Sequence, residues 1–271
     1  MAKSKSRLDV LLVQKGLVES REKAKALIMA GKVYSANIRL DKPGMMIEDH
    51  TELIIKGELH PYVSRGGLKL AKAIEIFKYE FTNMVVADIG ASTGGFTDCA
   101  LQNGAARVYA IDVGYGQLDW KLRSDPRVIV LERTNARHLE SNSIPEQVDW
   151  VVCDVSFISI IKIFPAMLNI LKENGQILIL IKPQFEAGPE NVGKNGVVKD
   201  KAIHRTVIEK VLTAGENQGL SVQGLSYSPI RGPEGNIEFL AWLTKDDKDG
   251  NKFDWLSNLT EIVQDAQKGT E

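Results

Sequence analysis

The spacing of apolar residues differs before and after residue 60, and in the front part of the chain it is mainly that of helices. Between residues 7 and 31, apolar residues recur three and four positions apart in two runs that end at Gly16 and Gly31. This spacing places apolar side chains on one helix face, and glycine readily ends a helix. Ser20, just before the second run, is a suitable N-cap. We therefore predict two short helices and then an alternating, turn-rich region that reaches Lys56. The apolar helix positions are Leu8, Leu11, Leu12, Ala24, Leu27 and Ile28.

Beyond residue 60, apolar runs of strand length alternate with stretches of helical spacing. This alternation is typical of α/β proteins with a parallel sheet. The expected strands are 85–88, 107–112, 128–131, 148–155, 176–182, 225–228 and 239–243, and the expected helices are 68–78, 96–101, 158–172 and 201–217. Right-handed crossovers bring the carboxyl ends of parallel strands to one edge of a sheet. Four charged residues, Asp88, Asp112, Asp154 and Lys182, would then lie along that edge.

The first of these strand ends opens into a glycine-rich loop. Asp88 is followed by Gly90, Gly94 and Gly95, and helical spacing resumes at Phe96. At a strand–loop–helix junction of this kind, exposed backbone N–H groups and a helix N-terminus bind small cofactors. The spacing differs from the G-x-G-x-x-G of dinucleotide folds. A glycine-rich turn without a cofactor is the alternative.

A second acidic residue favours a cofactor that contains adenosine. Asp112 ends the next strand about twenty positions further on, the spacing at which a carboxylate meets the ribose hydroxyls of a nucleoside. The loop resembles the first motif of S-adenosylmethionine methyltransferases, Asp-x-Gly-x-Gly-x-Gly, with Ser92 in the place of the middle glycine. An acidic strand end also suits the cationic sulfonium and amino group of that cofactor. The candidate cofactor-binding residues are Asp88, Gly90, Ser92, Gly94, Gly95, Phe96, Asp112 and Asp154.

The composition is that of a soluble globular protein with room for two domains. The chain has 271 residues, of which 44% are hydrophobic and 25% are charged. Its longest strongly apolar run, around 177–181, is too short for a membrane span, and no signal peptide is evident. We therefore expect a cytoplasmic protein without a membrane partner, with Cys99 and Cys153 as reduced thiols. The histidines and cysteines lack metal-ligand spacing, so no metal is expected.

The net charge of −1 conceals a basic front part. Residues 1–72 contain fourteen Lys and Arg against eight Asp and Glu, a balance of +6, while residues 244–271 contain four against seven, a balance of −3. This asymmetry indicates that the front of the chain meets a polyanion. A solvated charged face would give the same pattern.

The front part also resembles a known RNA-binding domain. The run Arg7-Leu8-Asp9-x-Leu11-Leu12, followed by Ser20-Arg21-x-x-Ala24 and Ile28-x-x-Gly31-x-Val33, is similar to the domain named after ribosomal protein S-four. The resemblance implies binding of structured RNA through its phosphates and helix shape. The candidate RNA-binding residues are Arg7, Arg21, Lys23, Lys25, Lys32 and Arg65.

Four charged residues in the rear part match a catalytic set. Lys69, Asp154, Lys182 and Glu238 follow the order and local context of the Lys-Asp-Lys-Glu tetrad of FtsJ-type ribose 2'-O-methyltransferases. The segments that surround the tetrad and the glycine-rich loop resemble the TlyA family over almost the whole chain. These segments are Ser64-Arg65-Gly66-Gly67-x-Lys69, 88–98, 153–159 and Lys182-Pro183-Gln184-Phe185-Glu186. A structural ion pair at the sheet edge is the alternative for Asp154 and Lys182.

The resemblance implies an architecture and an activity. The architecture is an α/β, Rossmann-like, seven-stranded methyltransferase domain with its last strand antiparallel, preceded by a small α+β S-four-type domain. The partition would be 1–60 for the RNA-binding domain, 61–67 for a linker, 68–245 for the methyltransferase domain and 246–271 for a tail or terminal helix. The activity would be S-adenosylmethionine-dependent methylation of a ribose 2'-hydroxyl, of cytidine, in ribosomal RNA or ribosomal subunits.

The residue types of the tetrad suit this chemistry. A ribose hydroxyl is a weak nucleophile at neutral pH, so it must lose its proton as it attacks the methyl group. Lys182, at the end of an apolar strand and near a cationic cofactor, would hold its proton less firmly and act as a base or as a hydrogen-bond director. Asp154 and Glu238 would hold the two lysines in place. Lys69 would pair with Asp154 and steer the hydroxyl.

The loop that follows Lys182 has no periodicity between residues 188 and 196. A long loop beside an active site is often a lid. Lys194 and Lys199 would meet the RNA backbone there, and a mobile solvated loop is the alternative.

Three other functions remain open from the sequence. The first is a membrane-damaging toxin, as the haemolysin name of some family members implies, but a long cationic amphipathic helix is missing. The second is an RNA-binding protein with an inactive methyltransferase domain, against which the intact tetrad argues. The third is a small-molecule O-methyltransferase, which would not need the basic front part.

Overall fold

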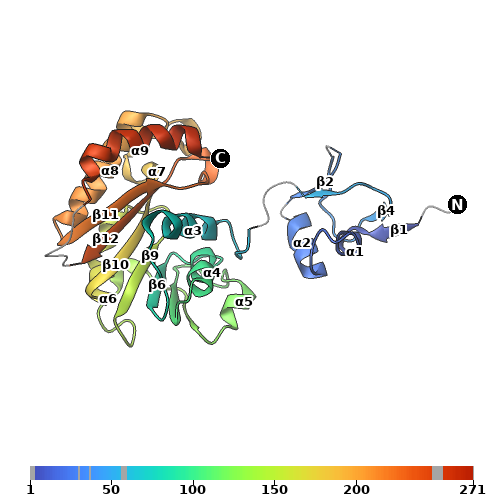
Figure 1. The fold of residues 1–271 in the computed structure, drawn as a ribbon, viewed down its shortest axis with the longest axis horizontal. Helices are drawn as coiled ribbons and strands as arrows, with labels where there is room; N and C mark the ends of the chain where they lie inside the picture. Colours follow the sequence, from blue (N-terminus) through green and yellow to red (C-terminus); the bar gives the residue numbers. More distant parts are fainter. Residues whose placement is uncertain (1–3, 30, 37, 56–59, 246–252, 271) are drawn as a thin grey trace. The chain divides into compact units, whose positions relative to one another are not determined.

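The chain forms two compact units, residues 1–59 and 60–271 (Figure 1). The computed structural model describes residues 4–29, 31–36, 38–55, 60–245 and 253–270. Lys56, at the end of the expected front region, and residues 246–252 of the expected tail lie outside the described residues.

The front unit is a small α+β module. Its helices are α1 (Leu8–Gln14) and α2 (Arg21–Met29), and its strands are β1 (Lys5–Arg7), β2 (Val33–Ser35), β3 (Ile38–Arg39), β4 (Met46–Glu48) and β5 (Ile54–Ile55). β1 pairs with β4, and β2 lies between β3 and β5, all antiparallel. Both predicted helices are confirmed. Gly16 and Gly31 follow them at a φ of +68°, and Ser20 Oγ accepts a hydrogen bond from Lys23 N at 3.2 Å. The two helices bury Leu8, Leu12 and Ile28 in a shared core.

The rear unit is built on a seven-stranded sheet in the order β11-β12-β10-β9-β6-β7-β8. The strands are β6 (Val85–Ile89), β7 (Arg107–Ile111), β8 (Val128–Leu131), β9 (Val148–Cys153), β10 (Leu171–Ile181), β11 (Leu220–Tyr227) and β12 (Phe239–Lys245). β12 is antiparallel to both of its neighbours, and the other paired strands are parallel. This mixed sheet confirms the predicted α/β fold. The carboxyl ends of β6, β7, β9 and β10 therefore meet at one edge.

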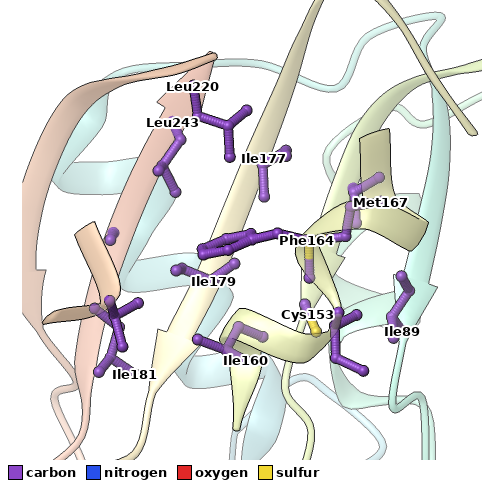
Figure 2. Close-up of a cluster of buried hydrophobic side chains, with 14 of the residues drawn as sticks. Ile89, Cys153, Ile160, Phe164, Met167, Ile177, Ile179, Ile181, Leu220 and Leu243 are labelled. Carbon is purple, nitrogen blue, oxygen red and sulfur yellow. The ribbon is translucent and has the colours of Figure 1, made fainter. Parts of the chain in front are cut away.

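Helices cover both faces of the sheet. They are α3 (Gly66–Phe77), α4 (Gly95–Gln102), α5 (Trp120–Arg123), α6 (Phe164–Ile170), α7 (Pro183–Glu186), α8 (Lys201–Glu216) and α9 (Trp255–Gly269). Alternate residues of β10 enter different cores. Figure 2 shows Ile177, Ile179 and Ile181 in the core that α6, α8 and α9 complete. Leu178 and Leu180 belong to the core that contains residues of α3 and α4. Burial on both faces explains why this strand reads as a continuous apolar run.

Three elements differ from their predicted bounds by more than two residues. The expected helix 158–172 is a 3-10 turn, Ile160–Lys162, followed by the short helix α6. Pro165 lies in the first turn of α6, where its missing N–H costs nothing, whereas inside a longer helix it would remove a hydrogen bond. β10 starts at Leu171 and reaches the regular part of its pairing only after a register shift. β11 starts at Leu220: its register shifts between Val222 and Gly224, and Gly224, which lies against the Phe77 ring, is paired again with Trp242.

The rear unit ends in α9, which buries Leu259 and Val263 in the same core as α8. Across the part of the chain that the structure describes, we find no helix with both the length and the apolar character needed to cross a bilayer.

Candidate active site

Four charged side chains from distant parts of the chain meet at the carboxyl edge of the sheet. Lys69 comes from the first turn of α3, Asp154 and Lys182 follow β9 and β10, and Glu238 precedes β12. Lys69 Nζ lies 2.6 Å from Glu238 Oε2 and 3.3 Å from Asp154 Oδ2. Lys182 Nζ lies 2.5 Å from Asp154 Oδ1. The four residues, called the tetrad below, thus form one chain of alternating charge.

The tetrad is withdrawn from solvent, and its ion pairs favour the charged forms of Lys69 and Asp154. Lys69 and Lys182 are each 7% exposed, and Glu238 is 0% exposed. Burial by itself would lower the pKa of Lys69, but Asp154 and Glu238 outweigh this effect and raise it. Burial likewise favours the neutral form of Asp154, but Lys69 and Lys182 lower its pKa. Removal of one member would leave an uncompensated buried charge, which is strongly unfavourable.

Ser156 is a fifth polar residue of this cluster. Its Oγ accepts a hydrogen bond from Lys182 Nζ at 2.9 Å. An ammonium group has three N–H donors, so Asp154 and Ser156 together engage two of them. Our sequence prediction missed Ser156, because a serine has no charge that marks it. Its position two residues after Asp154 was the only signal.

Two hollows open beside the tetrad. The first, called the tetrad hollow, has a volume of about 350 Å³ and is lined by Lys69 and by the glycine-rich loop. The second, called the loop hollow, has a volume of about 500 Å³ and extends to Asp112 at the end of β7. The two hollows adjoin, because four residues line both of them: Gly90, Ser92, Asp154 and Ser156.

The tetrad residues differ in how they reach these hollows. Lys69 and Asp154 line the tetrad hollow directly. Lys182 and Glu238 do not line either hollow. Lys182 instead contacts the walls through Asp154 and Ser156, and Glu238 holds Lys69.

The glycine-rich loop follows β6 closely because three of its residues, Gly90, Ser92 and Gly94, have positive φ. Gly90 has a φ of +84°, and a Cβ there would lie 2.8 Å from Asp154 O. Ser92, in the place of the motif's middle glycine, has a φ of +50°, a conformation that costs a non-glycine residue roughly 1–3 kcal/mol. Its N–H donates to Asp112 Oδ2 at 2.8 Å, and Gly114 N donates to Asp112 Oδ1 at 2.7 Å. These bonds hold the loop and the acidic end of β7 together.

Six of the eight candidate cofactor-binding residues line one or both hollows, namely Gly90, Ser92, Gly95, Phe96, Asp112 and Asp154. Asp88 and Gly94 line neither hollow. Asp88 is fully buried and accepts hydrogen bonds from Thr97 N at 2.9 Å and Thr97 Oγ1 at 2.6 Å. Burial raises its pKa to about 7. It therefore fastens α4 to β6 and does not face a cationic ligand. Gly94 is the N-cap of α4, where a Cβ would overlap the Leu122 side chain.

The loop hollow has further lining residues that the sequence did not single out. They follow β8 and β9 and combine polar and apolar side chains: Thr134, Asn135, Arg137, Phe157, Ile158 and Ile163. A carboxylate at one end and mixed walls suit a nucleoside-containing cofactor. Arg231 and Gly232, from the glycine-rich approach to Glu238, line the tetrad hollow. Among the residues described by the structure, no three His, Cys, Asp or Glu side chains gather in a way that could hold a metal ion.

In the front unit, two of the candidate RNA-binding residues share one buried carboxylate. Arg7 Nε lies 2.9 Å from Asp9 Oδ1, and Arg21 Nη2 lies 3.0 Å from Asp9 Oδ2. Asp9 is 0% exposed, while the side chains of Arg7 and Arg21 are 47% and 50% exposed. The hydrogen bond from Arg7 is the main cause that holds the pKa of Asp9 well below its usual range.

The remaining candidate RNA-binding residues are dispersed. Lys23 of α2 pairs with Glu19, which precedes this helix, at 3.3 Å, and Lys25 is exposed on the same helix. Lys32 is partly buried just before β2. Arg65 belongs to the rear unit, where it is exposed and lines the tetrad hollow.

The chain matches two models of protein families. Residues 62–245, more than half of the chain, match the FtsJ-like methyltransferase model, and residues 6–53 match the S4 domain model.

Known proteins are similar over nearly the whole chain. YqxC of Bacillus subtilis is 51% identical, over 90% of this chain and 87% of its own length. A Mycobacterium tuberculosis protein named 16S/23S rRNA (cytidine-2'-O)-methyltransferase TlyA is 44% identical, over 88% of this chain and 90% of its own length. The solved structure of a Streptococcus thermophilus protein, provisionally named a hemolysin, has 49% sequence identity and a TM-score of 0.77. It covers 99% of this chain and 98% of its own.

Proposed function

Since the chain belongs to the TlyA family of FtsJ-like methyltransferases, we propose that it methylates a ribose 2'-hydroxyl of ribosomal RNA with S-adenosylmethionine as the methyl donor. The observation that carries the proposal is the meeting of two hollows at Asp154 and Ser156, with Lys69 and Lys182 both paired to Asp154. One hollow would take the cofactor and the other the ribose, so that the reacting groups meet where the hollows adjoin.

The loop hollow fits the cofactor. Within the described residues, Asp112 has no cationic partner, and its carboxylate, just after β7, can accept hydrogen bonds from the two hydroxyls of a ribose. Gly90 lines this hollow, and the absence of a Cβ lets the loop approach the backbone at Asp154. When bound, S-adenosylmethionine supplies a methyl group on a sulfonium, which leaves as a neutral thioether.

The tetrad and Ser156 act on the ribose hydroxyl in the tetrad hollow. The bond from O2' to the methyl carbon forms while the hydroxyl proton departs. Lys69 has a raised pKa and Asp154 a lowered one, so neither is suited to accept this proton at neutral pH. Lys182 is the remaining candidate: its ammonium must first give up one proton, after which its amine can take up the hydroxyl proton, and Ser156 Oγ connects it to the hollow. Lys69 donates to the hydroxyl oxygen and positions it.

Both the front unit and the named relatives support ribosomal RNA as the proposed substrate. The S4 domain model covers this unit, and its half-exposed arginines can meet phosphates. The name of the M. tuberculosis relative gives cytidine as the modified nucleotide and 16S and 23S rRNA as its substrates. For this chain we propose the same nucleotide type, and accordingly action in the cytoplasm on ribosomal RNA or ribosomal subunits.

The experiment is a map of ribose methylation across ribosomal RNA from cells with and without this protein. One or more cytidines should lose their 2'-O-methyl group without the protein and regain it when the purified protein and S-adenosylmethionine are added. Identical maps, together with no transfer to ribosomal subunits in vitro, would refute the proposal.

A further inference from the structure

A third hollow lies in the rear unit beyond the tetrad hollow. It has a volume of about 350 Å³ and is called the basic hollow here. Its walls come from the segment after α7, from the approach to Glu238 and from the end of α9. The residues that line it are Lys194, Asn195, Val197, Val198, Lys199, Arg231, Glu234, Gly235, Ile237 and Gln267.

Positive charge dominates this hollow. Lys194 and Lys199 are exposed, and no ion pair engages either of them within the described residues. Arg231 donates a hydrogen bond to Gly235 O at 3.1 Å, which leaves its charge uncompensated. Glu234 is the only carboxylate among the lining residues. With three cations and one anion, the hollow attracts an anionic ligand.

Hydrogen bonds hold the segment around residues 196–198 of the basic hollow against the approach to Glu238. Asn236, only 2% exposed, accepts a hydrogen bond from Val198 N at 3.0 Å and donates one to Gly196 O at 2.9 Å. Its own carbonyl accepts from Gly232 N at 2.9 Å. The segment expected to be a lid therefore contains short 3-10 turns tied to the approach to Glu238. Such a fixed wall needs little ordering when a ligand binds.

The basic hollow lies beside the active site. Arg231 lines both the basic hollow and the tetrad hollow, so the two hollows share this residue. Asn236, which fastens the wall, is two residues from Glu238 of the tetrad. If the ribose of one RNA nucleotide occupies the tetrad hollow, the neighbouring phosphates of the RNA are only one nucleotide away. Those phosphates can reach Arg231 and the lysines behind it.

We propose that the basic hollow binds the sugar–phosphate backbone of the RNA beside the target ribose. The lining contains no aromatic ring on which a base could stack, and its cations suit phosphate oxygens. Contacts of this kind set the register of the RNA and do not read its sequence. The proposal rests on the proposed function, since it places the substrate of that same site.

The test compares variants with opposite expected effects on binding to ribosomal subunits from cells that lack the protein. Lys194→Ala/Lys199→Ala removes two cations from the hollow, and Glu234→Gln removes its anion. The matched control, Arg127→Ala/Lys172→Ala, removes two half-exposed cations at the opposite edge of the sheet. Equilibrium affinity is measured over a series of KCl concentrations, and methyl transfer is measured in parallel.

The lysine variant should bind several-fold more weakly, and its salt slope should be less steep by about one for each lost phosphate contact. Its KM for subunits should rise while kcat and cofactor affinity stay unchanged. Glu234→Gln should bind more tightly. The control pair should match the parent in affinity and slope, although it changes the net charge equally.

Equal affinities and slopes for the lysine variant and the parent would overturn the basic hollow as an RNA site, even if the parent methylates RNA. An equal loss in the control pair would overturn it too, since net charge alone would then explain the effect. If the lysine variant binds more weakly but the parent transfers no methyl group, the proposed function fails and the hollow stands.

Discussion

Each of the two units of this molecule contains a carboxylate that pairs with two cations. The cations are buried in the rear unit and half-exposed in the front unit. In the rear unit, Asp154 lies between Lys69 and Lys182, whose side chains are 9% and 8% exposed. In the front unit, Asp9 lies between Arg7 and Arg21, whose side chains are 47% and 50% exposed. The carboxylate is protected in both cases.

The difference lies in what the cations can still reach. The front arginines keep about half of their surface for a large polyanion, and the buried carboxylate only fixes their direction. The rear lysines are withdrawn from bulk water, so they can act only on a group that enters the adjoining hollows. Burial of the cations, and not the ion pairing itself, separates the proposed surface for RNA from the proposed site for chemistry.

The largest expected effect comes from breaking the buried ion pairs of the rear unit. Lys69→Ala and Glu238→Ala should each lower the rate of methyl transfer by about 10²–10⁴, because the positioned groups at the hydroxyl are lost. Their effects should not add to that of Lys182→Ala, since the tetrad acts as one unit. Rates for the single and double variants under saturating substrates check this. Additive losses would mean that the residues act independently.

A carboxylate without a cation provides a third case. Asp112 accepts two backbone N–H bonds and faces the loop hollow. Asp112→Ala should weaken S-adenosylmethionine binding by about 1–3 kcal/mol, since the cofactor's hydroxyls lose their partner. Titration calorimetry measures the affinity. An unchanged affinity would remove Asp112 from the cofactor site.

Changes to the half-exposed arginines of the front unit should affect binding and not chemistry. Arg21→Ala should weaken the affinity for ribosomal subunits several-fold and make the salt slope less steep by about one. The rate at saturating RNA should not change. Arg21→Lys should recover part of the affinity, because it keeps the charge but loses the fork that grips Asp9. A fall in the saturated rate would contradict the division between the two sites.

The smallest expected effect is on stability in acid. The pKa of Asp9 is lowered in the folded state, so its contribution to stability is present above the ordinary carboxyl pKa of about 4 and is lost as the pH falls below that value. Asp9→Asn should make the acid sensitivity of the front unit smaller. Asp49 in the same unit also has a lowered pKa, through hydrogen bonds with Ser4 and Ser6, so some sensitivity should persist. Hydrogen exchange of the α1 amides at two pH values measures this, and parallel pH dependence in variant and parent would count against the assignment.

The strand ends could be predicted from the sequence because they depend on local pattern and on a general rule of topology. A charged residue after an apolar run marks a strand end, and parallel strands bring such ends together. That reasoning placed Asp154 and Lys182 at one edge, where the structure joins them at 2.5 Å. The resemblance to a known tetrad supplied Lys69 and Glu238.

The direction of side chains could not be predicted in this way. Asp88 and Asp112 were both expected to end parallel strands, yet Asp88 lies inside β6 and turns toward Thr97, and only Asp112 faces a hollow. The contact of Ser156 with Lys182 and the fastening role of Asn236 also depend on tertiary packing. The break in the expected helix 158–172 is different, since Pro165 was visible in the sequence as its cause.

The central claim is that Lys182, held by Asp154 and Ser156, takes part in proton removal from the ribose hydroxyl. A single-turnover assay of methyl transfer to ribosomal subunits, with cofactor and RNA both saturating, tests it most directly. Lys182→Ala should transfer about 10²–10⁴ times more slowly with little change in either affinity. Lys182→Arg should not recover the rate, because a guanidinium stays protonated. Lys172→Ala, which alters a lysine–aspartate pair away from the site, should match the parent. Transfer by Lys182→Ala at the parent rate would contradict the account and leave Lys182 as half of a structural ion pair.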